Sequence, residues 1–221
     1  MKYLDFILTK AVELLEIDSP TGYTKDAVEY LCAEYCKLGY KPVVTVKGGV
    51  LVDLGGRDDK DALLLEAHTD TLGGMVAEIK GNGRLKLTSL GGLNPNNTEA
   101  ENCHVITREG KRIEGTFQIE NASVHVNDDY NGTKRGFERM EVLLDEAVNS
   151  KEDAEALGIM VGDIVAFETR TRITESGYIK SRFLDDKLSV AILLGYAKWL
   201  KDAGKVPARK VYQHITVYEE V

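Results

Sequence analysis

Two residues near the end of the first third of the chain could bind a metal ion and orient its ligand. His68 and Asp70 form a His-x-Asp pair directly after an apolar run. This spacing lets an imidazole bind a metal ion while the nearby carboxylate orients the other ring nitrogen. Taken alone, the pair is also compatible with a histidine that ends a strand by chance.

Two pairs of adjacent carboxylates offer further metal ligands. Asp185 and Asp186 stand at the expected start of a helix, where a helix cap explains acidic residues fully. Adjacent carboxylates can also bridge two cations, but taken alone this pair is better explained as a helix cap. Glu219 and Glu220 follow an apolar run and repel each other unless a cation or proton intervenes. One of them could bind metal while its neighbour acts as general base, or both could lie in a solvated loop.

One imidazole and several carboxylates at the ends of predicted elements suit Zn²⁺, Co²⁺ or Mn²⁺. The sequence has no Gly-x-Ser-x-Gly, Gly-x-Gly-x-x-Gly, phosphate-loop or His-Glu-x-x-His motif. His104, His125 and His214 lack metal-ligand spacing, so we expect them to be structural, the last two on strands. The joint pattern therefore favours metal-assisted chemistry over a serine nucleophile or nucleotide binding.

The length, net charge and apolar content of the chain limit the classes of partner that it can bind. The chain has 221 residues and a net charge of −8, which disfavours nucleic acid and anionic membrane surfaces as partners because both are negatively charged. No apolar run approaches the roughly 20 residues that span a bilayer, and the first residues do not resemble a signal peptide. The three cysteines have no framework spacing. We expect reduced thiols and a cytoplasmic location.

Periodicity predicts where these residues lie. Apolar residues at helical spacing predict helices over 4–17, 24–38 and 184–200. Runs at 41–46, 50–54, 62–67 and 211–218 read as strands, and the continuous apolar run 62–67 predicts a central strand covered on both faces. The residues 55–61 between two of these runs are expected to form a solvated turn. Helices alternating with such strands indicate an α/β sandwich.

Between the two α/β parts the pattern changes to short strand-like runs separated by Gly-rich turns. These runs fall at 75–79, 84–90, 102–107, 113–119, 124–126, 140–145 and 164–168, with one short helix near 151–157. The spacing predicts a small β-barrel or β-sandwich. We therefore expect an α/β domain in two parts, 1–70 and 167–221, interrupted by an inserted β-domain at 71–166.

The ordered set of motifs resembles a known family. The segments 19–22, 66–76, 122–129, 140–146, 157–163, 183–187 and 217–221 are similar to motifs of the tetrahedral and glutamyl aminopeptidases, which are two-metal peptidases of clan MH. The resemblance implies a mixed-sheet α/β/α catalytic domain with the inserted barrel. It also implies removal of N-terminal residues from short peptides by a water that two divalent metal ions activate, and homo-oligomers, as dimers and dodecamers, built through the β-domain.

The resemblance also assigns roles. His68, Asp185 and Glu220 would bind metal and should converge, Asp70 would orient His68, and Glu219 would be the general base. The Asp185–Asp186 peptide is expected to be cis.

The family supplies a later Asp and His as further ligands, and neither is present up to Val221. The resemblance thus implies an incomplete catalytic domain, with the two Zn²⁺, Co²⁺ or Mn²⁺ ions absent or only partly bound and the chain itself inactive. A non-catalytic assembly module and a deacylase of the same clan are the alternatives.

Overall fold

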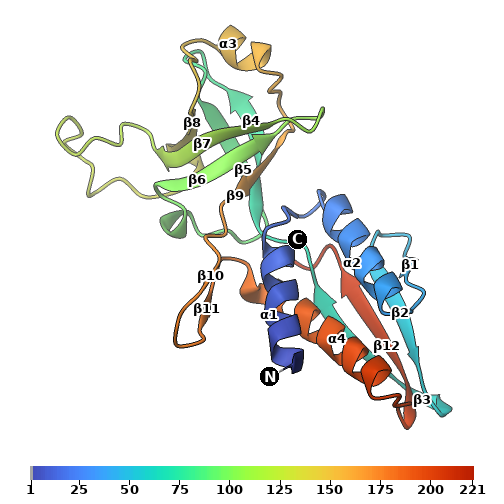
Figure 1. Cartoon of the computed structure of the whole chain (residues 1–221). Coiled ribbons are helices and arrows are strands. Elements are labelled where there is room, and N and C mark those ends of the chain that lie inside the picture. Colours follow the sequence, from blue (N-terminus) through green and yellow to red (C-terminus); the bar gives the residue numbers. More distant parts are fainter. Residues whose placement is uncertain (1) are drawn as a thin grey trace. The chain divides into compact units, whose positions relative to one another are not determined.

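The computed structural model describes residues 2–221, which divide into two compact units (Figure 1). The first unit comprises the residues up to Thr71 together with Thr169–Glu220, and the second comprises Leu72–Glu168 with the terminal Val221. Each unit has its own buried core, so the two are described separately. No helix in the described range is long and apolar enough to cross a membrane.

The first unit is built on a mixed four-stranded sheet with the strand order β1-β2-β12-β3. β12 runs antiparallel to β2 and parallel to β3, so β3 and β12 end at the same edge. A two-stranded hairpin, β10–β11, was not expected from the sequence. The elements are α1 (Lys2–Leu15), α2 (Lys25–Lys37), β1 (Val43–Val44), β2 (Val50–Gly55), β3 (Asp58–His68), β10 (Arg172–Ile173), β11 (Ile179–Lys180), α4 (Leu184–Asp202) and β12 (Arg209–Thr216).

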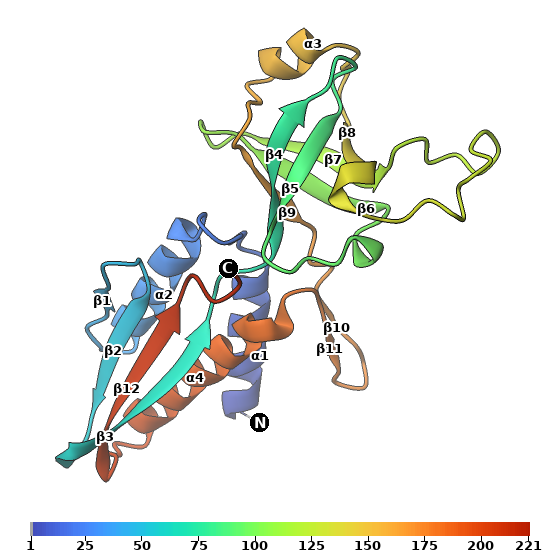
Figure 2. The same cartoon turned by 180° about the vertical axis from the view of Figure 1, so that it is seen from behind.

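The three helices of this unit lie on one face of the sheet, as the front and back views show (Figures 1 and 2). Leu14 of α1, Leu31 of α2 and Leu194 of α4 are fully buried against the sheet. Val52 of β2 and Ile215 of β12 supply the opposite side of this core. Because strand side chains alternate between faces, the neighbours of these residues point to the face without helices.

The prediction of a central, fully covered strand at residues 62–67 was wrong for the described residues. β3 pairs only with β12 and lies at the edge of the sheet. Leu63 and Leu64 are 44% and 49% exposed. A continuous apolar run indicates that a strand is suited to burial, but it does not predict whether strands pair with it on both sides. The strand also begins at Asp58, within the residues expected to form a turn.

The second unit is a closed barrel of six strands in the order β4-β5-β8-β7-β6-β9. Large side chains fill its interior, including Phe117 and Phe167, whose rings meet edge to face. Its elements are β4 (Gly73–Ile79), β5 (Leu85–Leu90), the 3₁₀ turn η1 (Pro95–Asn97), β6 (Glu101–Ile106), β7 (Arg112–Ile119), the 3₁₀ turn η2 (Phe137–Arg139), β8 (Met140–Leu144), α3 (Lys151–Ala156) and β9 (Ile164–Phe167). The mixed α/β fold with a small β-barrel is therefore confirmed.

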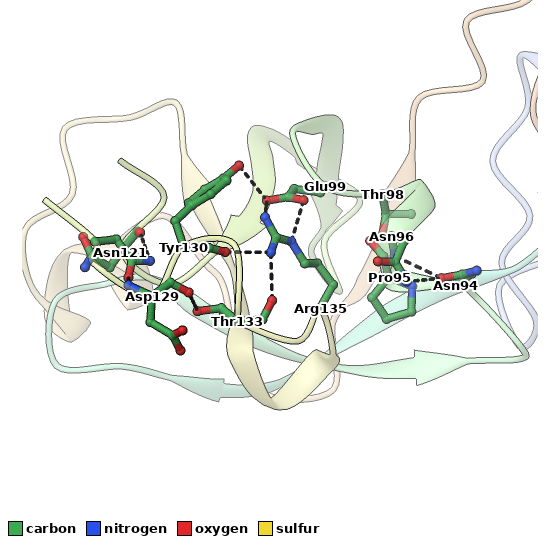
Figure 3. A network of polar contacts seen from close by, with 11 residues as sticks. Asn94, Pro95, Asn96, Thr98, Glu99, Asn121, Asp129, Tyr130, Thr133 and Arg135 are labelled. Atoms are coloured by element: carbon green, nitrogen blue, oxygen red, sulfur yellow. Dashed lines mark hydrogen bonds and ion pairs between the residues drawn. The ribbon is translucent and has the colours of Figure 1, made fainter. Parts of the chain in front are cut away.

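A long segment between β7 and β8 is ordered by polar contacts and not by pairing with other strands (Figure 3). The guanidinium of Arg135 donates to both carboxylate oxygens of Glu99, at 2.8 and 3.0 Å, and to the backbone carbonyls of Tyr130 and Thr133. The predicted strand at Val124–Val126 is wrong, because these residues form turns. Their apolar side chains are exposed, so alternation alone was not sufficient to make a strand.

Candidate metal centre

His68 is the last residue of β3, and its two ring nitrogens face different partners. Nδ1 lies 3.0 Å from the backbone oxygen of Asp70 and 3.4 Å from its Oδ1. A proton on Nδ1 satisfies these acceptors and leaves the lone pair on Nε2. Nε2 lies 3.2 Å from Asp185 Oδ1 and 3.6 Å from Glu219 Oε2. The imidazole is thus aimed, through one nitrogen, at two carboxylates.

Asp70 holds this arrangement together from a fully buried position. Its Oδ2 accepts a hydrogen bond of 2.7 Å from the Thr21 hydroxyl. The backbone amides of Glu219 and Glu220 donate to its two carboxylate oxygens, each at 3.3 Å. Burial favours the neutral acid, but hydrogen bonds from His68, Thr21 and these amides outweigh it and lower the pKa of Asp70. Both carboxylate oxygens of Asp70 are therefore engaged by the protein.

The loop after α1 ties the segment around Asp70 in place. The Ser19 hydroxyl donates to the backbone carbonyl of Thr69 at 2.6 Å. The backbone amides of Thr21 and Thr71 donate to the carbonyls of Thr71 and Ser19, respectively. Sequence reasoning identified residues 19–22 only as a segment similar to a family motif and missed the roles of Ser19 and Thr21. The one available signal was the pair of hydroxyl residues next to Pro20.

Asp185 reaches the site from the first turn of α4. The Asp185–Asp186 peptide is cis, as the resemblance implied, and both residues have non-helical backbone angles. The side chain of Asp185 is 92% exposed, although its Oδ1 lies within hydrogen-bonding distance of His68. The carboxylate of Asp185 therefore remains accessible to a ligand.

Glu219 and Glu220 lie directly beyond β12, whose end is joined to β3 by the Thr69 amide and the Thr216 carbonyl at 3.0 Å. One ligand atom each from His68, Glu219 and Glu220 can be chosen so that all three lie within 4.8 Å of one another. Glu219 was assigned as a base by resemblance, yet its distance also allows it to act as a ligand.

The charges of the cluster are unbalanced. Burial disfavours the charged imidazolium, but the hydrogen bonds and negative charge of Asp70, together with Asp185, raise the pKa of His68 to about 9. Burial also raises the pKa of the Glu220 carboxyl, and although His68 opposes this, the neighbouring carboxylates increase the shift. Four carboxylates thus surround a single imidazole, and a divalent cation would relieve their repulsion.

The structure brings His68, Asp70, Asp185, Glu219 and Glu220 together at the ends of β3 and β12 and the start of α4. His214 lies on β12 and contacts Glu66 at 3.1 Å, consistent with a structural role. His125 lies in the exposed segment between β7 and β8 and not on a strand. The three cysteines are free thiols.

Comparison with known proteins identifies the family. The profile of the M42 glutamyl aminopeptidases matches residues 48–221, and the chain therefore belongs to this family of hydrolases. It is 47% identical over 182 residues to YhfE of Bacillus subtilis (strain 168), a protein named as an aminopeptidase. It is 27% identical over 198 residues to the glutamyl aminopeptidase of Lactococcus lactis subsp. cremoris.

The match involves nearly the whole of this chain but only part of the other proteins. It covers 82% of this chain and 53% of YhfE, and 89% of this chain and 55% of the Lactococcus enzyme, so the chain spans about half the length of these relatives. The fold is likewise that of a larger protein, the TET aminopeptidase of Thaumarchaeota archaeon SCGC AB-539-E09. The TM-score is 0.87 at 24% identity, covering 98% of this chain and 60% of that one.

Proposed function

We propose that this protein is a metal-dependent aminopeptidase that removes N-terminal residues from short peptides. The observation that carries the proposal is the direction of His68. Its Nδ1 is held by Asp70 while its Nε2 faces Asp185 and Glu219. A histidine oriented in this way by a buried carboxylate is the usual arrangement of a metal-binding imidazole. The M42 family is generally metal-dependent, which agrees with this donor set.

The residues present fit divalent Zn²⁺, Co²⁺ or Mn²⁺. One nitrogen and several carboxylate oxygens are the ligands that these ions accept. We propose that His68, Asp185 and Glu220 would hold the metal ions, to which the exposed carboxylate of Asp185 is accessible. Asp70 orients His68 and does not bind metal, because both of its oxygens already accept hydrogen bonds.

The proposed reaction divides the work among the same side chains. Two bound ions would supply Lewis acidity to the scissile carbonyl and to the attacking water. Glu219 then takes a proton from that water, since its carboxylate is exposed beside His68, and passes it to the leaving amine. Asp70 keeps the Glu219 and Glu220 backbone in position through its two amide contacts.

Residues 2–221 contribute one imidazole and three available carboxylates to this centre. A catalytic zinc ion has three protein ligands as a rule, so two ions need donors beyond this set. We propose that the isolated 221-residue polypeptide binds metal weakly and has little or no peptidase activity. We also propose that the two units are a catalytic domain and a dimerisation domain of a cytoplasmic homo-oligomer. The TET1 peptidase of Pyrococcus horikoshii, a structural neighbour, assembles into a tetrahedron or an octahedral shell.

The test compares peptidase activity in matched histidine variants. Release of the N-terminal residue from short peptides is measured with added Co²⁺ or Zn²⁺, for the 221-residue chain and for a polypeptide extended to the length of the relatives. We expect activity in the extended protein, its loss in His68→Ala, and its retention in His214→Ala, which removes a histidine from the neighbouring strand.

The same assay separates the alternatives. Hydrolysis of N-acetylated amino acids without release of unblocked N-terminal residues would instead indicate a deacylase. An oligomeric extended protein that hydrolyses neither kind of substrate would indicate an assembly module.

A further inference from the structure

Lys187 is a buried lysine in the first turns of α4, two residues after Asp185. It is only 1% exposed and ranks among the largest fully buried side chains. Its Nζ donates to the backbone carbonyls of Leu14 at 3.0 Å and Ile17 at 2.6 Å. These contacts join residues separated by about 170 positions in the sequence.

The two carbonyls belong to the end of α1 and the residues just beyond it. The last carbonyls of a helix have no partner inside the helix, and the helix dipole makes this end negative. A cation here is favourable, so Lys187 acts as a C-terminal cap supplied by another helix. Its ammonium group gives the Ile17 carbonyl a donor and adds a second donor to the Leu14 carbonyl, which also accepts from the Ile17 amide at 3.2 Å.

Burial of an ammonium group opposes this arrangement. Removing an ammonium group from water costs free energy, and this one is nevertheless almost completely buried. An apolar side chain of similar length would avoid the desolvation cost while filling the same space. Packing alone therefore does not explain a lysine at this position. Unlike an apolar side chain, it forms hydrogen bonds that join the start of α4 to the end of α1.

Those two segments carry different parts of the metal centre. The chain that leaves α1 at Ile17 continues into Ser19 and Thr21, whose side chains bind Thr69 and Asp70. The other segment is the first turn of α4, which carries Asp185. Lys187 therefore connects the backbone that supports Asp70 to the backbone that presents Asp185.

We propose that Lys187 is a positioning residue that sets the separation of Asp185 from the His68–Asp70 pair by binding the end of α1 to the start of α4. This inference rests on the proposed metal centre. Loss of the tie lets the α4 turn move relative to the loop at Ser19–Thr21, and the metal ligands lose their shared geometry. Substitution of residues that support metal ligands typically weakens metal binding by about 10–100-fold.

The experiment titrates Co²⁺ into the 221-residue chain and follows the visible absorption of the bound ion, with urea unfolding measured in parallel. Lys187→Met removes both donors and keeps the length of the side chain. Tyr35→Phe is the matched control, because it removes a buried hydrogen bond to Gln213 in the same unit without contacting the site. His68→Ala reports whether the measured binding belongs to the proposed centre.

We expect Lys187→Met to raise the Kd for Co²⁺ about tenfold and to alter the absorption spectrum, while Tyr35→Phe changes only stability. If Lys187→Met does not fold, Lys187→Gln retains one donor and should raise the Kd about threefold. Unchanged affinity in a folded Lys187 variant, with reduced stability, would overturn the positioning role and leave the metal centre intact. Co²⁺ binding that His68→Ala does not weaken would instead overturn the proposed centre, and the inference with it.

Discussion

At the scale of single residues, the orientation of the His68 imidazole is set by groups other than the exposed carboxylates of the site. Asp70 fixes the imidazole through Nδ1, and Thr21 and two backbone amides fix Asp70. Each of these groups is buried or belongs to the backbone, so their positions depend on the packed fold. The accessible carboxylates of Asp185 and Glu219 can then meet a ligand without first ordering the histidine.

Removing the Thr21 hydroxyl should test this chain of support. Thr21→Val deletes a charge-assisted hydrogen bond of 2.7 Å to Asp70 and leaves a buried carboxylate oxygen with one donor fewer. Such bonds contribute about 1.5–3 kcal/mol, so we expect urea unfolding to report a loss of about 2 kcal/mol. Thr9→Val is the control, since the Thr9 hydroxyl binds an exposed backbone carbonyl on α1. Equal losses in the two variants would contradict a special role for Thr21.

The types of the site residues were predictable from the sequence, but most of their supports were not. His68, Asp185 and Glu219 stand at element ends, where local patterns identify them. Thr21 and Lys187 act through contacts with distant segments. The hydroxyl residues on either side of Pro20 were the one local signal for Thr21, and Lys187 had no signal that distinguishes it from a surface lysine. A sequence pattern indicates which face of a helix or strand a residue occupies. The roles of Thr21 and Lys187 depend instead on which distant segment the fold places next to them.

At the scale of elements, the packing of α1 on α4 determines how the first turn of α4 is held. Gly195 of α4 faces Ile7 of α1 so closely that an added Cβ would lie 2.4 Å from Ile7 Cγ1 and 2.7 Å from its Cδ1. The two helices therefore approach each other at a position where only glycine fits. The sequence predicted both helices correctly but gave no sign of this contact.

Gly195→Ala should destabilise the first unit. Overpacking of this kind costs about 1–3 kcal/mol, and the better helix propensity of alanine returns at most about 1 kcal/mol. We expect a net loss of about 1–2 kcal/mol in urea unfolding. Introducing the same change into an Ile7→Ala background should remove the overpacking cost. A loss of the same size in both backgrounds would show that Ile7 is not the obstacle.

In the barrel, Glu120 directly follows β7 and forms ion pairs with Lys80, which follows β4, and with Lys86 of β5. It lies 2.8 Å from both Lys80 and Lys86, which lower its pKa to about 2. Because the folded pKa is depressed below the ordinary value, this carboxylate stabilises the fold at neutral pH and loses that effect as the pH falls from about 5 to 2. The side chain is partly exposed, so the contribution is below about 1 kcal/mol.

Glu120→Gln should therefore reduce stability at pH 7 and make little difference near pH 2. The difference in urea midpoint between the two proteins is measured across this range, which cancels the titration of the other carboxylates. Glu109→Gln, in the turn between β6 and β7, serves as the control and should show no such trend. A constant difference at every pH would exclude the ion pairs as its cause.

At the scale of the whole molecule, each unit has its own core and can unfold as its own cooperative step. We expect scanning calorimetry of the 221-residue chain to resolve two transitions. Gly195→Ala should lower the transition of the α/β unit alone, and Glu120→Gln that of the barrel alone. A single transition that both substitutions lower by the same amount would show that the units do not unfold independently.

The existence of both units was predictable from the switch between helical and alternating periodicity, but the open edge at β3 was not. The run at residues 62–67 is as apolar as a central strand, and Leu63 and Leu64 are nevertheless exposed in residues 2–221. Sequence pattern describes what a strand can bury, while exposure depends on what else is present to cover it. The same distinction applies to the metal centre, whose donors lie at the ends of β3 and β12 and at the start of α4.

A crystal of the protein soaked in millimolar Zn²⁺, with diffraction recorded at the zinc absorption edge, tests the proposed centre most directly. We predict an anomalous peak about 2.0–2.1 Å from His68 Nε2, with the carboxylates of Asp185 and Glu220 among its ligands and Asp70 still bound to Nδ1. Zinc bound elsewhere, with His68 Nε2 still in contact with the Asp185 carboxylate, would contradict the assignment of these residues as the metal centre.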